Sequence, residues 1–124
     1  DQSGEPKKKR ASGINKKAFR QKKSKIVKEK SRQLSPLKKK IASIENNIER
    51  NERLIEETND KLLSASEQQD GAKIQKLSKT LADLQQENED LFERFEQLMD
   101  EHDTLEAEFE SQLEALEKEI YDAE

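Results

Sequence analysis

The feature that most constrains this chain is a 3.5-residue spacing of apolar side chains, held through two long runs. Steps of three and four alternate, which places one narrow stripe along a helix, as in a coiled-coil seam. The first run is Leu34, Leu37, Ile41, Ile44, Ile48, Asn51, Ile55, Thr58 and Leu62, and the second is Ile74, Leu77, Leu81, Leu84, Asn88, Leu91, Phe95, Leu98, His102 and Leu105. The spacing predicts an all-α protein.

The segment SASEQQDG, residues 64–71, separates the two runs and ends the first stripe. Small and polar residues are typical of a turn, and Gly71 adopts positive φ at little cost. A short connection makes the flanking helices antiparallel neighbours. We therefore predict an antiparallel two-helix coiled-coil hairpin over residues 35–124, with its turn at about 66–72.

The register of this hairpin follows from its two seam asparagines. In an antiparallel pair the numbers of facing residues add to a constant, and a sum of 139 places Asn51 opposite Asn88. Each amide can then satisfy the other, which penalises slipped registers. The same sum pairs Ile55 with Leu84, Ile48 with Leu91, Ile44 with Phe95, and Ile41 with Leu98.

Composition argues against a conventional globule, because 42% of the residues are charged, 30% hydrophobic and only 4% aromatic. Without cysteine, neither disulfides nor thiolate metal sites are possible. No apolar run approaches the roughly 20 residues of a membrane span. We therefore expect a cytoplasmic location.

Charge is sorted along the chain. Residues 1–40 contain 16 basic and three acidic residues, whereas residues 41–124 contain eight basic and 25 acidic residues. The basic run, residues 16–40, is the candidate nucleic-acid site, because clustered cations neutralise phosphates. Its candidate residues are Lys16, Lys17, Arg20, Lys22, Lys23, Lys25, Lys28, Lys30, Arg32, Lys38, Lys39 and Lys40. The alternative is that the acidic tail, residues 101–124, already neutralises the run.

The apolar residues outside the main stripes suggest that run and tail lie together. The stripe jumps eight residues from Leu105 to Leu113 and reaches Ile120, and it jumps eight back from Leu34 to Ile26 and reaches Phe19. We therefore predict a flexible basic linker over residues 1–14 and a basic, partly helical arm over residues 15–34 beside the tail. Pro36 predicts a kink or break, with Ser35 capping a new helix.

No catalytic constellation is present, so we expect this chain to be no enzyme. His102 falls on the seam opposite Leu37, and a lone histidine makes a poor metal site, so we predict no metal. The glycines are too scattered for a phosphate-binding loop. A second stripe, Phe92, Met99, Leu113 and Ile120, predicts either extra packing or a surface for a protein partner.

A basic region before a leucine repeat also invites comparison with bZIP proteins, since Asn15, Ala18 and Phe19 occupy roughly the expected places. Lys22 and Lys23 depart from that motif, and Pro36 interrupts the required helix. This interpretation is the weaker one.

The segment KSRQLSPLKKKIASIENNIERNERLIEETNDKLLSAS, followed by a turn and KIQKLSKTLADLQQENEDLFERFEQL, resembles the C-terminal extension of ABC-F ATP-binding cassette proteins of the Uup/YheS-like branch. The likeness covers most of residues 22–117. It includes the basic lead-in, the LSPLKK entry and the LFERFEQL core. Some relatives carry a Trp in the second helix, and Phe95 or Phe109 would take that place here.

The resemblance implies an accessory domain that binds ribosomal RNA or DNA and supports a translation-related ATPase on the ribosome. Its implied partners are nucleic acid, the ribosome and the ATP-binding cassettes of the same chain, without a membrane, and we expect a monomer. ATP and Mg belong to the parent protein, so no cofactor is expected in this region. The alternative function is a structural coiled coil for protein interaction, with a self-neutralised basic run.

Overall fold

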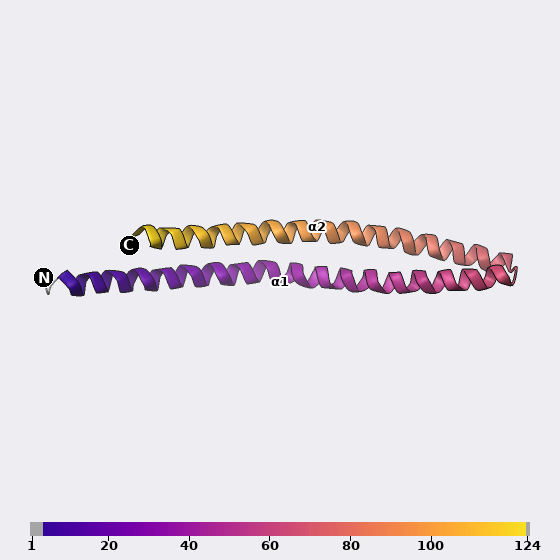
Figure 1. Cartoon of the computed structure of the whole chain (residues 1–124), viewed down its shortest axis with the longest axis horizontal. Helices are drawn as coiled ribbons and strands as arrows, with labels where there is room; N and C mark the ends of the chain where they lie inside the picture. The colour runs from indigo at the N-terminus through magenta and orange to yellow at the C-terminus, as the bar shows by residue number, and fades with distance from the viewer. Residues whose placement is uncertain (1–3, 124) are drawn as a thin grey trace. The chain divides into compact units, whose positions relative to one another are not determined.

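The computed structural model describes the backbone of residues 4–123 and the side chains of residues 16–120. Helix α1 is Gly4–Glu67 and helix α2 is Gly71–Ala123, joined by the three residues 68–70 (Figure 1). All other described backbone is helical, which confirms the predicted all-α hairpin. The predicted flexible linker, residues 1–14, lies outside the described side chains and stays a prediction.

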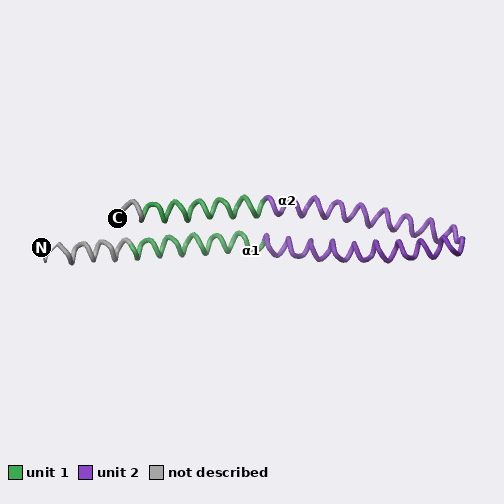
Figure 2. The backbone as a smooth tube through the Cα atoms, viewed as in Figure 1, with its two compact units in different colours: residues 1–36, 101–124 green, residues 37–100 purple. Residues whose placement is uncertain are grey.

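The chain divides into two compact units, each formed by antiparallel stretches of α1 and α2 (Figure 2). The turn unit is Leu37–Asp100 and contains the loop. The terminal unit combines Asp1–Pro36 with Glu101–Glu124. The predicted juxtaposition of the basic arm with the acidic tail is therefore confirmed, as a property of the terminal unit.

The core of the turn unit is the predicted seam, extended by Ala65, which was predicted to lie in the turn segment and instead belongs to the last turns of α1. Its buried side chains are Leu37, Ile41, Ile48, Ala65 and Leu98, together with the polar Asn51, Thr58 and Asn88. Seam residues between them, such as Ile44, Leu84 and Phe95, are half-buried. A surface hollow that Ile55 shares with Gln85 and Asn88 agrees with the register derived from the two asparagines.

The two seam asparagines are buried, but they do not satisfy each other. Asn51 is 2% exposed and Asn88 is 8% exposed. Asn51 Nδ2 and Asn88 Oδ1 have no hydrogen-bond partner among the described atoms. The predicted mutual hydrogen bond is therefore wrong: the helices bury both amides, yet a donor and an acceptor stay unpaired, at a cost of about 1–3 kcal/mol each.

The loop closes α1 with a Schellman motif. The Asp70 N–H donates to the Ala65 carbonyl at 3.0 Å, and the Gln69 N–H donates to the Ser66 carbonyl at 3.1 Å. Gln69 takes the left-handed conformation, with φ at 55°. The expectation that Gly71 supplies the positive φ is wrong, because the chain reverses two residues earlier and Gly71 is already the first residue of α2.

Asp70 also begins the second helix. Its Oδ1 accepts a hydrogen bond from the Lys73 N–H at 3.2 Å, and its carbonyl accepts one from the Ile74 N–H at 3.0 Å. This is the geometry of an N-cap. One residue therefore completes the end of α1 and the start of α2, which explains how so short a loop reverses the chain.

The terminal unit packs around Leu34, Phe109 and Leu116, which are its buried hydrophobic side chains in the described range. Phe109 lies four residues after Leu105 and four before Leu113, so the predicted eight-residue jump in α2 is two steps of four. Two such steps in succession locally unwind a coiled coil. The predicted contact residues Phe19, Ile26, Leu113 and Ile120 are half-buried.

Pro36 lies inside α1, which continues through it, so of the predicted kink or break the break is wrong, and the kink stays a prediction. The proline nitrogen cannot donate to the Arg32 carbonyl, and the ring crowds that carbonyl. Ser35, predicted to cap a new helix, is an exposed interior residue of α1. The missing hydrogen bond nevertheless coincides with a structural boundary, because the terminal unit ends at Pro36 on α1.

Candidate nucleic-acid interface

In the terminal unit the basic run is helical, and most of its cations are exposed. Only a narrow edge of α1 faces α2, and that edge carries the half-buried Phe19 and Ile26. Lys25, Lys28 and Arg32 follow the i, i+3, i+7 spacing of a single helix face, and all three are exposed. The predicted cations of this unit that are exposed are Lys16, Lys17, Arg20, Lys22, Lys23, Lys25, Lys28 and Arg32.

Lys30 makes the one ion pair between α1 and α2 that the described side chains contain. Its Nζ lies 2.8 Å from Glu110 Oε1, and the Lys30 side chain is 25% exposed. The hydrogen bond to Glu110 raises the pKa of Lys30 above its ordinary value. Lys30 occupies the seam position four residues before Leu34, so its charge serves the hairpin and is the least available of the predicted site residues.

Glu29 is the sole acidic residue between residues 16 and 40, and it is already paired. Its carboxylate accepts hydrogen bonds from Arg32 Nη2 at 2.6 Å and from Gln33 Nε2 at 2.8 Å. The bond to Arg32 lowers the pKa of Glu29, and the same bond raises the pKa of Arg32. This carboxylate therefore neutralises one cation of its own helix and leaves the others.

Two smaller features complete the basic run. The Lys23 Nζ lies 5.8 Å from the centroid of the Phe19 ring, within cation–π range, while its side chain stays exposed. Lys38, Lys39 and Lys40 belong to the turn unit, where they are exposed on α1 just before the buried Ile41. Among the described side chains these three make no ion pair.

Three lysines outside the predicted site also gather in the turn unit. Lys61, Lys73 and Lys76 line one hollow beside the loop. In the sequence they are scattered cations in an acidic half. The signal that could have found them is the register sum of 139, which places Lys61 on α1 opposite Ser78 on α2, between the turns that carry Lys73, Lys76 and Thr80.

His102 forms a small polar cluster on α2 in the terminal unit. Its Nδ1 lies 3.1 Å from Asp103 Oδ1 and 3.5 Å from Glu106 Oε2, and its side chain is 13% exposed. The ligand atoms of these three residues lie within 4.8 Å of one another, so they are the described residues best placed to hold a cation. The contact with Asp103 satisfies the histidine without one, and the predicted lack of a metal stays a prediction.

The second apolar stripe is divided between the units. Leu113 and Ile120 are half-buried in the terminal unit, as expected for extra packing. In the turn unit Met99 is half-buried, and Phe92 remains 45% exposed. The stripe therefore does not form one continuous surface in either unit.

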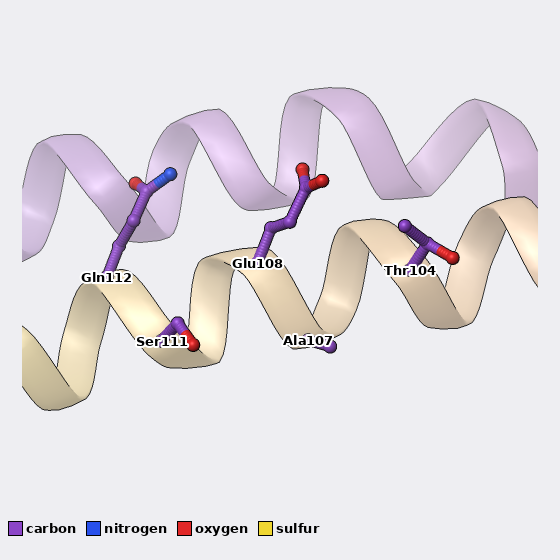
Figure 3. A pocket seen from close by; sticks show the side chains of 5 residues that line it. All are labelled: Thr104, Ala107, Glu108, Ser111 and Gln112. Carbon is purple, nitrogen blue, oxygen red and sulfur yellow. The ribbon is translucent and has the colours of Figure 1, made fainter.

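Helix α2 also has a shallow hollow of about 560 Å³ in the terminal unit. Figure 3 shows its five lining residues on this one helix: Thr104, Ala107, Glu108, Ser111 and Gln112. A carboxylate and small side chains form it, without a second helix to enclose a ligand. It is a gap between surface side chains rather than a candidate site.

No helix of the described chain combines the length and apolarity that crossing a membrane requires.

Comparison with known proteins identifies the family. Searches of curated proteins and of solved structures gave no match. The family model of the ABC transporter C-terminal domain matches residues 20–100, which is more than half of the chain and includes most of the basic run, the loop and the whole turn unit. The chain therefore belongs to the ABC transporter C-terminal domain family, as its resemblance to ABC-F proteins predicted.

Proposed function

We propose that this hairpin is a nucleic-acid-binding accessory domain of an ABC-F ATPase. The basic run contacts the phosphates of ribosomal RNA or DNA, and the domain supports a translation-related ATPase in the cytoplasm without catalysing a reaction itself. The family match supports the connection to ABC ATPases. The cassettes of the parent protein, with their ATP and Mg, supply the chemistry.

The observation that carries this proposal is that most cations of the basic run are exposed and form no ion pair with the acidic tail. If the acidic tail neutralised the run, ion pairs would be expected along the whole terminal unit. The described side chains contain one such pair across the helices, Lys30 with Glu110. The other cations of the run face solvent, apart from Arg32 on Glu29. Exposed cations on a rigid helix bind phosphates by releasing counterions, with little dependence on base sequence.

The experiment measures the affinity for a labelled RNA duplex and for a DNA duplex over a series of salt concentrations. The test variant replaces Lys22, Lys23, Lys25 and Lys28 with Glu. A matched control replaces four exposed cations elsewhere with Glu: Arg50, Arg53, Arg94 and Lys118. Both variants change the net charge equally. We expect the wild-type chain to bind with a steep salt slope, and the test variant to lose about three to four of the released counterions on duplex DNA.

The control separates a localised interface from general charge. An equal loss of affinity in both variants would show that net charge governs binding and would remove the role assigned to the basic run. Weak, salt-independent binding by the wild-type chain would reject the function itself. It would favour the alternative, a structural coiled coil whose exposed Phe92 meets a protein partner.

A further inference from the structure

The charged residues that line the hollow beside the loop are all basic. It has a volume of about 470 Å³, and both helices of the turn unit line it. From α1 come Lys61, Ser64, Ala65 and Gln68, and from α2 come Lys73, Lys76, Leu77 and Thr80. Both sets follow the spacing i, i+3, i+4, i+7, so each is one face of its helix. None of these eight residues is acidic, although the region from residue 41 onward carries 25 acids against eight cations.

The floor of the hollow explains why it exists. Ala65 occupies a seam position and is only 2% exposed, while most neighbouring seam positions carry Leu or Ile. A methyl group there leaves room between the helices that a larger side chain would fill. Leu77 provides the rest of the apolar base. The other lining residues are the three lysines, Ser64, Thr80 and Gln68, so the hollow is basic and carries hydrogen-bond donors on its lysines, on Ser64 and on the Gln68 amide.

The first turn of α2 adds to this positive field. The amino end of a helix carries partial positive charge, so acidic residues are favoured there and lysine is not. The first turn of α2 contains no acidic residue, and Lys73 lies within it. The carboxylate of Asp70, the residue just before this turn, accepts the hydrogen bond from the Lys73 N–H. An anion in the hollow would relieve this unfavourable arrangement.

The lysines of the hollow are not neutralised by the protein around them. Among the described side chains, neither Lys61, Lys73 nor Lys76 lies within ion-pair distance of a carboxylate. Thr80 Oγ1 donates to the Lys76 carbonyl at 3.2 Å, so the proton of that hydroxyl is engaged on its own helix, and the lysine ammonium groups are the charged donors that the hollow offers a ligand. Three ammonium groups around one space fit a phosphate, with its several charged acceptor oxygens.

We propose that this hollow is a phosphate-binding site. It is separate from the basic run, and it takes a phosphate group either from a nucleic-acid backbone or from a free polyphosphate. The inference goes beyond the proposed function and stands without it, because none of its residues belongs to the basic run.

The test uses the full chain and two probes. Pyrophosphate is titrated while the backbone amide signals are followed by NMR. An RNA duplex is then titrated into the variant that carries Glu at positions 22, 23, 25 and 28, so that the basic run contributes little. The site variant is Lys73→Gln with Lys76→Gln, and the matched control is Lys79→Gln with Arg94→Gln. Lys79 and Arg94 are exposed cations of α2 outside the hollow.

We expect pyrophosphate to shift the amides of the lining residues and the site variant to weaken binding about tenfold, as for the loss of charge-assisted hydrogen bonds. The control should change affinity less than about twofold. If the RNA shifts the same amides, a nucleic-acid backbone is the source of the phosphate; if only pyrophosphate does, the source is a free polyphosphate. Equal weakening in both variants, or shifts spread evenly over all cations, would overturn the proposal.

Discussion

The two units follow the same seam rule with different contents. The turn unit buries three polar side chains, Asn51, Thr58 and Asn88, whereas the buried side chains described in the terminal unit are apolar. Thr58 is satisfied on its own helix, since its Oγ1 donates to the Leu54 carbonyl at 2.6 Å. The asparagines are not. Buried amides cost stability but discriminate between registers, so the turn unit gives up stability for a defined alignment.

The terminal unit has no such polar marker in its described core, and charge distinguishes its two helices instead. Its α1 stretch is basic and its α2 stretch is acidic, so they attract each other over a distance although only Lys30 and Glu110 form a close pair. The family match includes the whole turn unit and stops at residue 100, before the α2 stretch of the terminal unit. The buried asparagines therefore define the alignment of the turn unit. The terminal unit is held by an apolar core and by the attraction between its basic α1 stretch and its acidic α2 stretch.

Replacing Phe109 with Ala tests this contrast most severely. Phe109 is 5% exposed and is the largest side chain in the described core of the terminal unit. Its loss should cost about 3 kcal/mol, because the packed ring leaves a cavity that a two-helix structure fills only in part. We expect faster amide hydrogen exchange in residues 16–36 and 101–120 and nearly unchanged exchange in residues 37–100.

The matched control is Phe92→Ala, which deletes the same atoms from the turn unit. Phe92 is 45% exposed, so its removal should change stability by less than about 1 kcal/mol. If Phe109→Ala accelerated exchange equally in both units, the two would unfold as one cooperative structure and the contrast between them would not hold.

The double variant Asn51→Leu, Asn88→Leu tests the other side of the comparison. Removing a buried unpaired donor and acceptor together should raise the free energy of unfolding by about 2 kcal/mol. The same change should weaken register control, so sedimentation at increasing concentration should reveal more association than the wild-type chain shows under the same conditions. An unchanged or lower stability would show that the two amides are satisfied in solution.

The sequence could predict the structural features that follow from the repeated spacing of apolar residues. The heptad spacing predicted the hairpin, and the positions of Asn51 and Asn88 predicted an alignment that the Lys30–Glu110 contact matches to within one residue in the terminal unit. It could not predict side-chain geometry. Burial of both amides does not guarantee a hydrogen bond between them, and a flexible glutamine took the positive φ expected of Gly71.

The candidate site likewise has a part that the sequence predicts and a part that depends on the three-dimensional structure. That residues 16–40 are basic was plain from composition, but which cations stay exposed depends on where the narrow edge toward α2 falls. The basic hollow needed the hairpin itself, because Lys61 and Lys76 are distant in sequence and meet only when the chain reverses. The small Ala65 that makes room between them lies in the segment predicted to be the turn, so the seam spacing did not single it out.

The loop offers a smaller test, confined to the turn unit. Gln69 holds φ at 55°, a conformation that costs a non-glycine residue about 1 kcal/mol or more. Gln69→Gly should therefore raise the free energy of unfolding by about 0.5–1 kcal/mol, since the relief of strain exceeds the extra freedom of glycine in the unfolded chain. Chemical denaturation measures this. Gln68→Gly, one residue earlier, is the control and should destabilise; a gain there of equal size would assign the effect to loop flexibility instead.

The smallest expected effect concerns the Lys30–Glu110 pair of the terminal unit. Because the hydrogen bond to Glu110 raises the pKa of Lys30, the pair contributes stability below the ordinary lysine pKa of 10.5 and loses it as the pH rises through the higher folded-state value. The ¹³Cε signal of Lys30 reports this titration. Its midpoint should fall in the Glu110→Gln variant, while Lys30→Arg should keep the pair intact at pH values where lysine has lost its proton. If the titration midpoint of Lys30 were the same in the Glu110→Gln variant, the contact would not persist in solution. The terminal unit would then be held by its apolar core and long-range attraction alone.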